Sequence, residues 1–130
     1  MDTNGHEEEK LLHGELVYSI VGSALEVLRE VGHGLHEKPY ENGLIIELRL
    51  RGHLPEQQRR FPVLYKTQLI SEFVPDLIVD NAVVVDAKVI DRITDHERGE
   101  MMNYLRITKL RVGVILNFKR AKLEWERIVL

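Results

Sequence analysis

The feature that most constrains the fold is a nearly unbroken apolar run close to the C-terminus, residues 110–117, with the sequence LRVGVILN. A strand with one solvated face alternates apolar and polar residues, whereas a strand that is covered on both faces has no need to alternate. The run therefore predicts a buried strand in a central sheet that is flanked by helices.

Three segments have the spacing of amphipathic helices. Over residues 16–31 the apolar side chains recur at intervals of three and four, and Gly32 ends the segment. Residues 39–51 begin with a proline, which is favoured in the first turn of a helix, and carry an apolar stripe. A third helix is expected over residues 95–107, with Thr94 or Asp95 as its capping residue.

The segments between and after these helices are rich in Val, Ile, Phe and Tyr. We expect an antiparallel meander over residues 61–65, 68–79 and 82–90, and a final strand over residues 122–130. The predicted order is α-α-β-β-β-α-β-β, an α/β (α+β) fold with a mixed central sheet. We expect a flexible N-terminal arm over residues 1–12 and a single domain over residues 13–130.

Composition removes several classes of function. Cysteine is absent, which excludes disulfides, iron–sulfur clusters and thiolate zinc sites and is consistent with a cytoplasmic protein. No apolar run approaches the roughly 20 residues that span a bilayer, so no membrane partner is expected. The net charge is −3 and the pI is about 6.1, so any contact with nucleic acid must use local basic patches. Three such patches are present, at residues 57–60, 109–111 and 119–122.

Three polar side chains interrupt the apolar middle strands: Asp76, Asp86 and Lys88. Side chains alternate faces along a strand, so Asp86 and Lys88 point the same way. A tight turn through Asp80, Asn81 and Ala82 would place Asp76 and Asp86 opposite each other on neighbouring strands. The spacing therefore predicts two carboxylates and an amine on one face of the sheet.

This combination suits a divalent cation. Two adjacent carboxylates repel each other unless a cation lies between them, and oxygen ligands favour Mg²⁺ or Mn²⁺. A hard cation in that position activates water and stabilises charge on a phosphoryl oxygen. The lysine can orient the water, assist its deprotonation or neutralise the phosphate.

The same residues resemble a known pattern. Pro75-Asp76, followed after nine residues by Asp86-Ala87-Lys88, resembles the PD-(D/E)xK signature of metal-dependent nucleases. Residues 34–40, GLHEKPY, match the G-x-x-E-x-x-Y motif of the GxxExxY family, which is assigned to that superfamily. Residues 100–104 stand where RecB-type members carry Q-x-x-x-Y, and the resemblance extends from about Ile20 to Leu130.

The resemblance implies a restriction-endonuclease-like core and a role for each matching residue. Asp76 and Asp86 would be metal ligands, with the Ala87 carbonyl as a third ligand, and Lys88 would be the catalytic lysine. Glu37 matches a helical acid that helps to hold the metal in related nucleases. Residues at the substrate edge would be Glu100, Tyr104 and Tyr40. Two departures are Asp86 in place of the usual glutamate and Glu100 in place of glutamine, and the second adds negative charge where phosphate would approach.

Each of these residues also has a purely structural interpretation. The aspartates could be surface residues of a half-exposed sheet, and Lys88 could be their salt-bridge partner. Glu37 could be an acid favoured at a helix N-terminus, and Tyr40 is more typical of a packing aromatic with a bonded hydroxyl. His33 and His36 lack a third histidine at ligand spacing, so a zinc site there is disfavoured.

The sequence leaves two functions open. The first is a Mg²⁺- or Mn²⁺-dependent phosphodiester hydrolase that acts on nucleic acid, with DNA as the first candidate. The second is a catalytically weak or inactive module on the same scaffold that binds nucleic acid or a protein partner. A homo-oligomer formed through the C-terminal strand is compatible with both functions.

Overall fold

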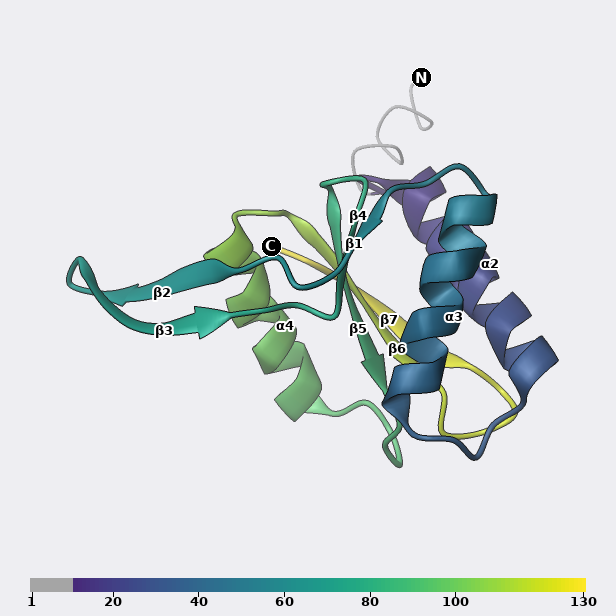
Figure 1. Cartoon of the computed structure of the whole chain (residues 1–130). Coiled ribbons are helices and arrows are strands. Elements are labelled where there is room, and N and C mark those ends of the chain that lie inside the picture. The colour runs from purple at the N-terminus through teal and green to yellow at the C-terminus, as the bar shows by residue number, and fades with distance from the viewer. Residues whose placement is uncertain (1–10) are drawn as a thin grey trace, which may run out of the picture.

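The computed structural model describes residues 11–130, which form three helices and two sheets (Figure 1). The helices are α2 (Gly14–Val31), α3 (Glu37–Leu50) and α4 (Asp95–Thr108). The main sheet has the strand order β1-β4-β5-β6-β7 and contains β1 (Pro55–Glu56), β4 (Leu77–Val79), β5 (Val83–Lys88), β6 (Val112–Asn117) and β7 (Glu124–Val129). Strands β2 (Phe61–Tyr65) and β3 (Gln68–Phe73) form a separate hairpin that projects from the body (Figure 1).

The predicted fold class and order of elements are confirmed, with two corrections to the meander. The segment expected as one strand over residues 68–79 breaks at Val74, Pro75 and Asp76, which separate β3 from β4. As a consequence β2 and β3 pair only with each other, and the main sheet receives the short strand β1 beside β4 instead. A proline supplies no backbone N–H to a ladder, so a break at Pro75 is physically reasonable.

The main sheet is mixed. Strand β5 is antiparallel to β4 and parallel to β6, and β6 is antiparallel to β7. Helix α4 makes the crossover between the parallel strands β5 and β6, as such connections require. All six residues of β6 are buried, which agrees with the covered central strand that its apolar run predicts.

The helices cover both faces of the sheet, with α2 and α3 on one side and α4 on the other (Figure 1). The larger core lies under α2 and α3 and contains Val83, Val85 and Ala87 of β5. The smaller core lies under α4 and includes Val84. Strand β5 therefore sends alternate side chains into two different environments, which positions the site described below.

The N-terminal boundary differs slightly from the prediction. Helix α2 begins at Gly14, two residues before the expected start at Leu16. The predicted arm over residues 1–12 lies almost wholly outside the described residues, and Leu12, which is within them, packs against the larger core. No helix in the described part of the chain has the length and apolar character that a bilayer span requires.

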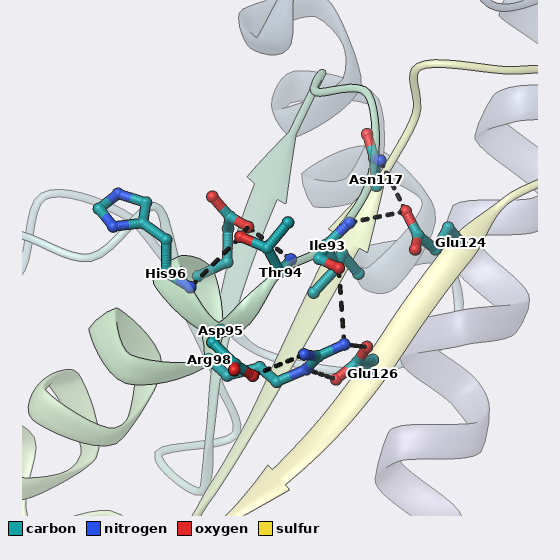
Figure 2. A network of polar contacts seen from close by, with 9 residues as sticks. Ile93, Thr94, Asp95, His96, Arg98, Asn117, Glu124 and Glu126 are labelled. Carbon is teal, nitrogen blue, oxygen red and sulfur yellow. Dashed lines mark hydrogen bonds and ion pairs between the residues drawn. The ribbon is translucent and has the colours of Figure 1, made fainter.

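Helix α4 is held firmly at its first turn. Thr94 and Glu97 form a capping box, in which each side chain bonds to the other's backbone, so Thr94 is confirmed as the cap. Arg98 in the same turn pairs with Glu126 of β7, with Nη2 and Oε2 2.7 Å apart (Figure 2). These contacts fix the start of α4 against the edge of the sheet.

Candidate active site

The hairpin of β4 and β5 brings the two aspartates together. Leu77 pairs with Val85, so Asp76 and Asp86 occupy the next opposed positions. Asp76 Oδ2 accepts a hydrogen bond of 3.0 Å from the Ala87 N–H, which ties one carboxylate to the strand that carries the other. The two-residue turn of Asp80 and Asn81, both at φ of 53°, makes this tight pairing feasible.

Lys88 lies between acidic side chains. Its Nζ is 3.3 Å from Asp86 Oδ2 and 3.4 Å from Glu100 Oε1. The two residues of β5 point to the same side of the sheet, as strand alternation predicts, and Glu100 reaches them from α4. The site therefore joins the end of β5 to the second turn of α4.

Burial dominates the electrostatics of Asp86. Removal from water raises the pKa of the Asp86 carboxyl to about 7; the positive charge of Lys88 opposes this rise and the negative charge of Asp76 adds to it. Its Oδ2 atom is buried and makes no hydrogen bond within residues 11–130, although the Lys88 ammonium is close. Two neighbouring carboxylates supply oxygen atoms of the kind that hard divalent cations accept as ligands.

The neighbouring groups keep Lys88 charged. Burial lowers the pKa of the Lys88 ammonium, but the negative charges of Asp86 and Glu100 outweigh burial and raise this pKa above its usual value. Burial, with the charges of Glu100 and Asp86, also raises the pKa of the Tyr104 hydroxyl. At neutral pH the site therefore presents an ammonium and a neutral phenol.

A small pocket of about 160 Å³ opens over these residues. Its walls come from the end of β3, the loop before β4, strand β5 and the helices α3 and α4, and they include Asp76, Asp86, Lys88, Glu37, Tyr104 and Phe73. A hollow of about 1210 Å³ between α2 and β7 is larger but shares no residue with this pocket. The charged groups, and not the size of the cavity, distinguish the smaller pocket as the candidate site.

The glutamate and the tyrosine of the G-x-x-E-x-x-Y motif lie in different environments. Glu37, the first residue of α3, lines the pocket, so its predicted role as an acid near the metal remains a prediction. Tyr40 is fully buried and stacks on Phe118 with ring centroids 4.6 Å apart. Its hydroxyl donates to the Gly32 carbonyl at 2.7 Å and accepts from the Leu35 N–H at 3.2 Å. The structure therefore places Tyr40 in the core, closing the loop between α2 and α3, rather than at the substrate edge.

Both other residues predicted at the substrate edge reach the site. Glu100 pairs with Lys88, and Tyr104 lines the pocket one helical turn further along α4. Sequence reasoning missed Phe73, whose ring stacks on Tyr104 with centroids 4.1 Å apart. The position of Phe73 in the sequence could have indicated its role, because it ends β3 only three residues before Asp76.

The donor set fits a metal that needs few protein ligands. Within residues 11–130 no three His, Cys, Asp or Glu side chains are grouped to hold a metal ion. The carboxylates of Asp76 and Asp86 supply two oxygens, and Mg²⁺ is commonly held by one or two carboxylates together with waters and substrate phosphate. The two aspartates therefore suit a hard divalent ion and do not form a closed structural site.

Comparison with known proteins agrees with this geometry. The family model described as the PD-(D/E)XK nuclease superfamily matches residues 14–128, nearly the whole chain. No curated protein and no solved structure matches the chain. The match includes Pro75, Asp76, Asp86 and Lys88, the residues that converge on the pocket. The chain belongs to the PD-(D/E)XK nuclease superfamily.

Proposed function

We propose that this protein is a Mg²⁺- or Mn²⁺-dependent phosphodiester hydrolase that acts on nucleic acid, with DNA as the first candidate substrate. One observation carries the proposal. Asp76, Asp86 and Lys88 meet in a single pocket on one face of the sheet, in a chain of the nuclease superfamily. The GxxExxY family remains the subfamily that residues 34–40 favour.

Each residue has a role in this reaction. Asp76 and Asp86 would hold the divalent ion, with the Ala87 carbonyl and Glu37 as further candidate ligands. A divalent ion bound there supplies Lewis acidity, which lowers the pKa of water and offsets charge on the phosphate. The hydrogen bond from the Ala87 N–H fixes the Asp76 carboxylate, so this ligand is oriented before any ion binds.

The charge state of Lys88 selects among its candidate roles. An ammonium with a raised pKa keeps its proton at neutral pH, so it is a poor base for water. It is well suited to stabilise negative charge on a phosphoryl oxygen. Tyr104, neutral and at the pocket wall, would donate a hydrogen bond to the same phosphate.

A second function is favoured by one specific contact. Glu100 is 3.4 Å from the Lys88 ammonium, so the cation that should meet phosphate already has an acidic partner on α4. A non-catalytic module that binds nucleic acid or a protein would tolerate this pairing. In an active enzyme the Glu100 carboxylate must give way when phosphate enters.

A cleavage assay separates the two functions. Purified protein is incubated with single- and double-stranded DNA and with RNA, in Mg²⁺, in Mn²⁺ and in a chelator. The hydrolase predicts cleavage that needs the metal and is abolished in Lys88→Ala. A matched variant, Lys38→Ala, removes an exposed lysine from the first turn of α3 and should cleave normally. Wild-type protein that cuts none of these substrates with either metal would overturn the hydrolase and leave the module.

A further inference from the structure

Two loops leave the sheet side by side next to the candidate site. The loop over residues 89–94 follows β5, and the loop over residues 118–123 follows the parallel strand β6. Lys88 and Asn117 are register partners at the ends of these strands, and the Phe118 N–H donates to the Lys88 carbonyl at 2.9 Å. The first loop begins directly after Lys88, and the second begins one strand spacing away, because neighbouring strands lie about 5 Å apart.

These loops carry positive charge in an otherwise acidic chain. Four basic residues and one acidic residue give them a net charge of +3, whereas the whole chain has a net charge of −3. The basic residues are Arg92, Lys119, Arg120 and Lys122, and all four are exposed. Charge of this sign concentrated beside a phosphate-cleaving site is what nucleic-acid backbones require.

The loops enclose a hollow of about 470 Å³, which we call the basic end pocket. Its lining includes three cations, two acids and an aromatic residue: Arg92, Arg120, Lys122, Asp91, Glu124 and Trp125. Trp125 is the second residue of the edge strand β7 and is 44% exposed. Arg120 donates to the Asp91 carbonyl, which bends its side chain back over the first loop. Cationic groups beside an exposed aromatic face are the usual elements of a surface that binds unpaired nucleotides.

A partly buried polar network joins the loop after β5 to Asn117 and Glu124, which line the basic end pocket (Figure 2). Asn117, almost completely buried, donates from Nδ2 to Glu124 Oε1 and to the Ile90 carbonyl, both at 2.9 Å. Glu124, which also lines the pocket, accepts from the Ile93 N–H at 3.1 Å through the same Oε1 atom, so two hydrogen bonds offset the negative charge of this carboxylate. The cations are therefore presented on a fixed frame, which lowers the ordering cost of binding.

We propose that the basic end pocket binds the nucleic-acid strand that flanks the cleaved bond, with phosphates on Arg92, Arg120 and Lys122 and an unpaired base stacked on Trp125. The inference rests on the proposed function for its substrate class and assigns it a strand preference. The protein should bind single-stranded nucleic acid more tightly than a blunt duplex of the same sequence, because a paired base cannot present its face to Trp125.

The chain offers its own reporter, because Trp125 is its single tryptophan. Binding is measured by the anisotropy of a labelled single-stranded oligonucleotide, in chelator, on the Lys88→Ala background so that nothing is cleaved. Tryptophan quenching is recorded in parallel. The double variant Arg120→Ala/Lys122→Ala should bind about tenfold more weakly, and its log–log salt slope should fall by about 1.4 for two lost phosphate contacts. Trp125→Ala should also weaken binding by about tenfold.

The matched control is Arg29→Ala/Arg49→Ala, which removes two exposed arginines from α2 and α3 and should leave affinity unchanged. The inference is overturned if the basic end pocket variants bind the oligonucleotide with the same affinity as the control variant. It is also overturned if the oligonucleotide binds without quenching tryptophan fluorescence. These outcomes are independent of catalysis. If binding depends on the basic end pocket but the wild-type protein cleaves nothing, the inference is supported and the hydrolase is overturned. If the wild-type protein cleaves but binding does not depend on the basic end pocket, the hydrolase is supported and the inference is overturned.

Discussion

The two faces of the main sheet are built for different purposes, although they share the same strands. Under α2 and α3 the sheet packs a continuous apolar core that contains Val85, Ala87 and Leu116. Under α4 the apolar cluster is smaller and, on β5, gives way to Asp86 and Lys88. Buried charges cost free energy unless they are paired, and Asp86 and Lys88 form an ion pair with each other.

Core residues and candidate site residues alternate along the single strand β5. Consecutive residues of β5 belong to opposite faces, so a change at Asp86 or Lys88 should affect the site, whereas a change at Val83 or Ala87 should affect the larger core. Breaking one face at a time is the direct way to test whether that separation holds.

The site face should respond to Asp86→Asn with a loss of catalysis. We expect the rate of metal-dependent cleavage to fall by about 10³-fold or more, because a ligand charge is lost while the shape is kept. The thermal midpoint of the metal-free protein should not fall, since the change removes a buried carboxylate that repels Asp76. Cleavage assays and calorimetry on the same preparation measure both quantities, and a variant that unfolds would contradict the separation.

The core face should show the opposite response. Leu116→Ala empties a fully buried position on β6 and should lower the free energy of unfolding by about 2–5 kcal/mol. Cleavage per folded molecule should stay near that of the wild type. The control is Ile46→Ala, which truncates an exposed side chain on α3 and should change stability by less than about 0.5 kcal/mol. Urea titration gives the two free energies.

A pair of glycines tests the packing under α4. A Cβ atom at Gly113 would lie 2.3 Å from Met101 Sδ, so Gly113→Ala should cost about 1–3 kcal/mol as the methionine is displaced. Gly99 within α4 has no atom within 4 Å of such a Cβ, and Gly99→Ala should stabilise the protein by about 0.4–1 kcal/mol. Equal effects at the two glycines would show that the smaller core is loosely packed.

Acid should lower the stability that the contact between Arg98 and Glu126 provides, but only slightly. The hydrogen bonds from Arg98 hold the pKa of the Glu126 carboxyl below its usual value. A depressed carboxyl pKa stabilises the fold above the unfolded pKa of about 4.3, and that contribution is lost as the pH falls through the folded pKa. Wild-type stability should therefore decline more steeply below about pH 5 than that of Glu126→Gln. Thermal midpoints across this pH range give the two slopes, and parallel slopes would contradict the account.

The sequence was sufficient to predict that Asp76, Asp86 and Lys88 share one face of the sheet, but not which residues of α4 and β3 surround them. The period of two along residues 83–88 and the turn at Asp80 and Asn81 are local signals, so the pairing of Asp76 with Asp86 followed from spacing alone. The salt bridge from Lys88 to Glu100 could not be derived, because it depends on how α4 crosses the sheet. The hairpin of β2 and β3 was misplaced because the apolar residues on both sides of Pro75 resemble one continuous strand.

Titration calorimetry with Mn²⁺ is the most direct test of the proposed hydrolase, because that function needs a cation between Asp76 and Asp86. The wild-type protein should bind the ion through these carboxylates, and Asp76→Asn and Asp86→Asn should each abolish binding while the protein remains folded. Wild-type protein that releases no heat of binding, or an Asp86→Asn variant that binds Mn²⁺ as the wild type does, would contradict it.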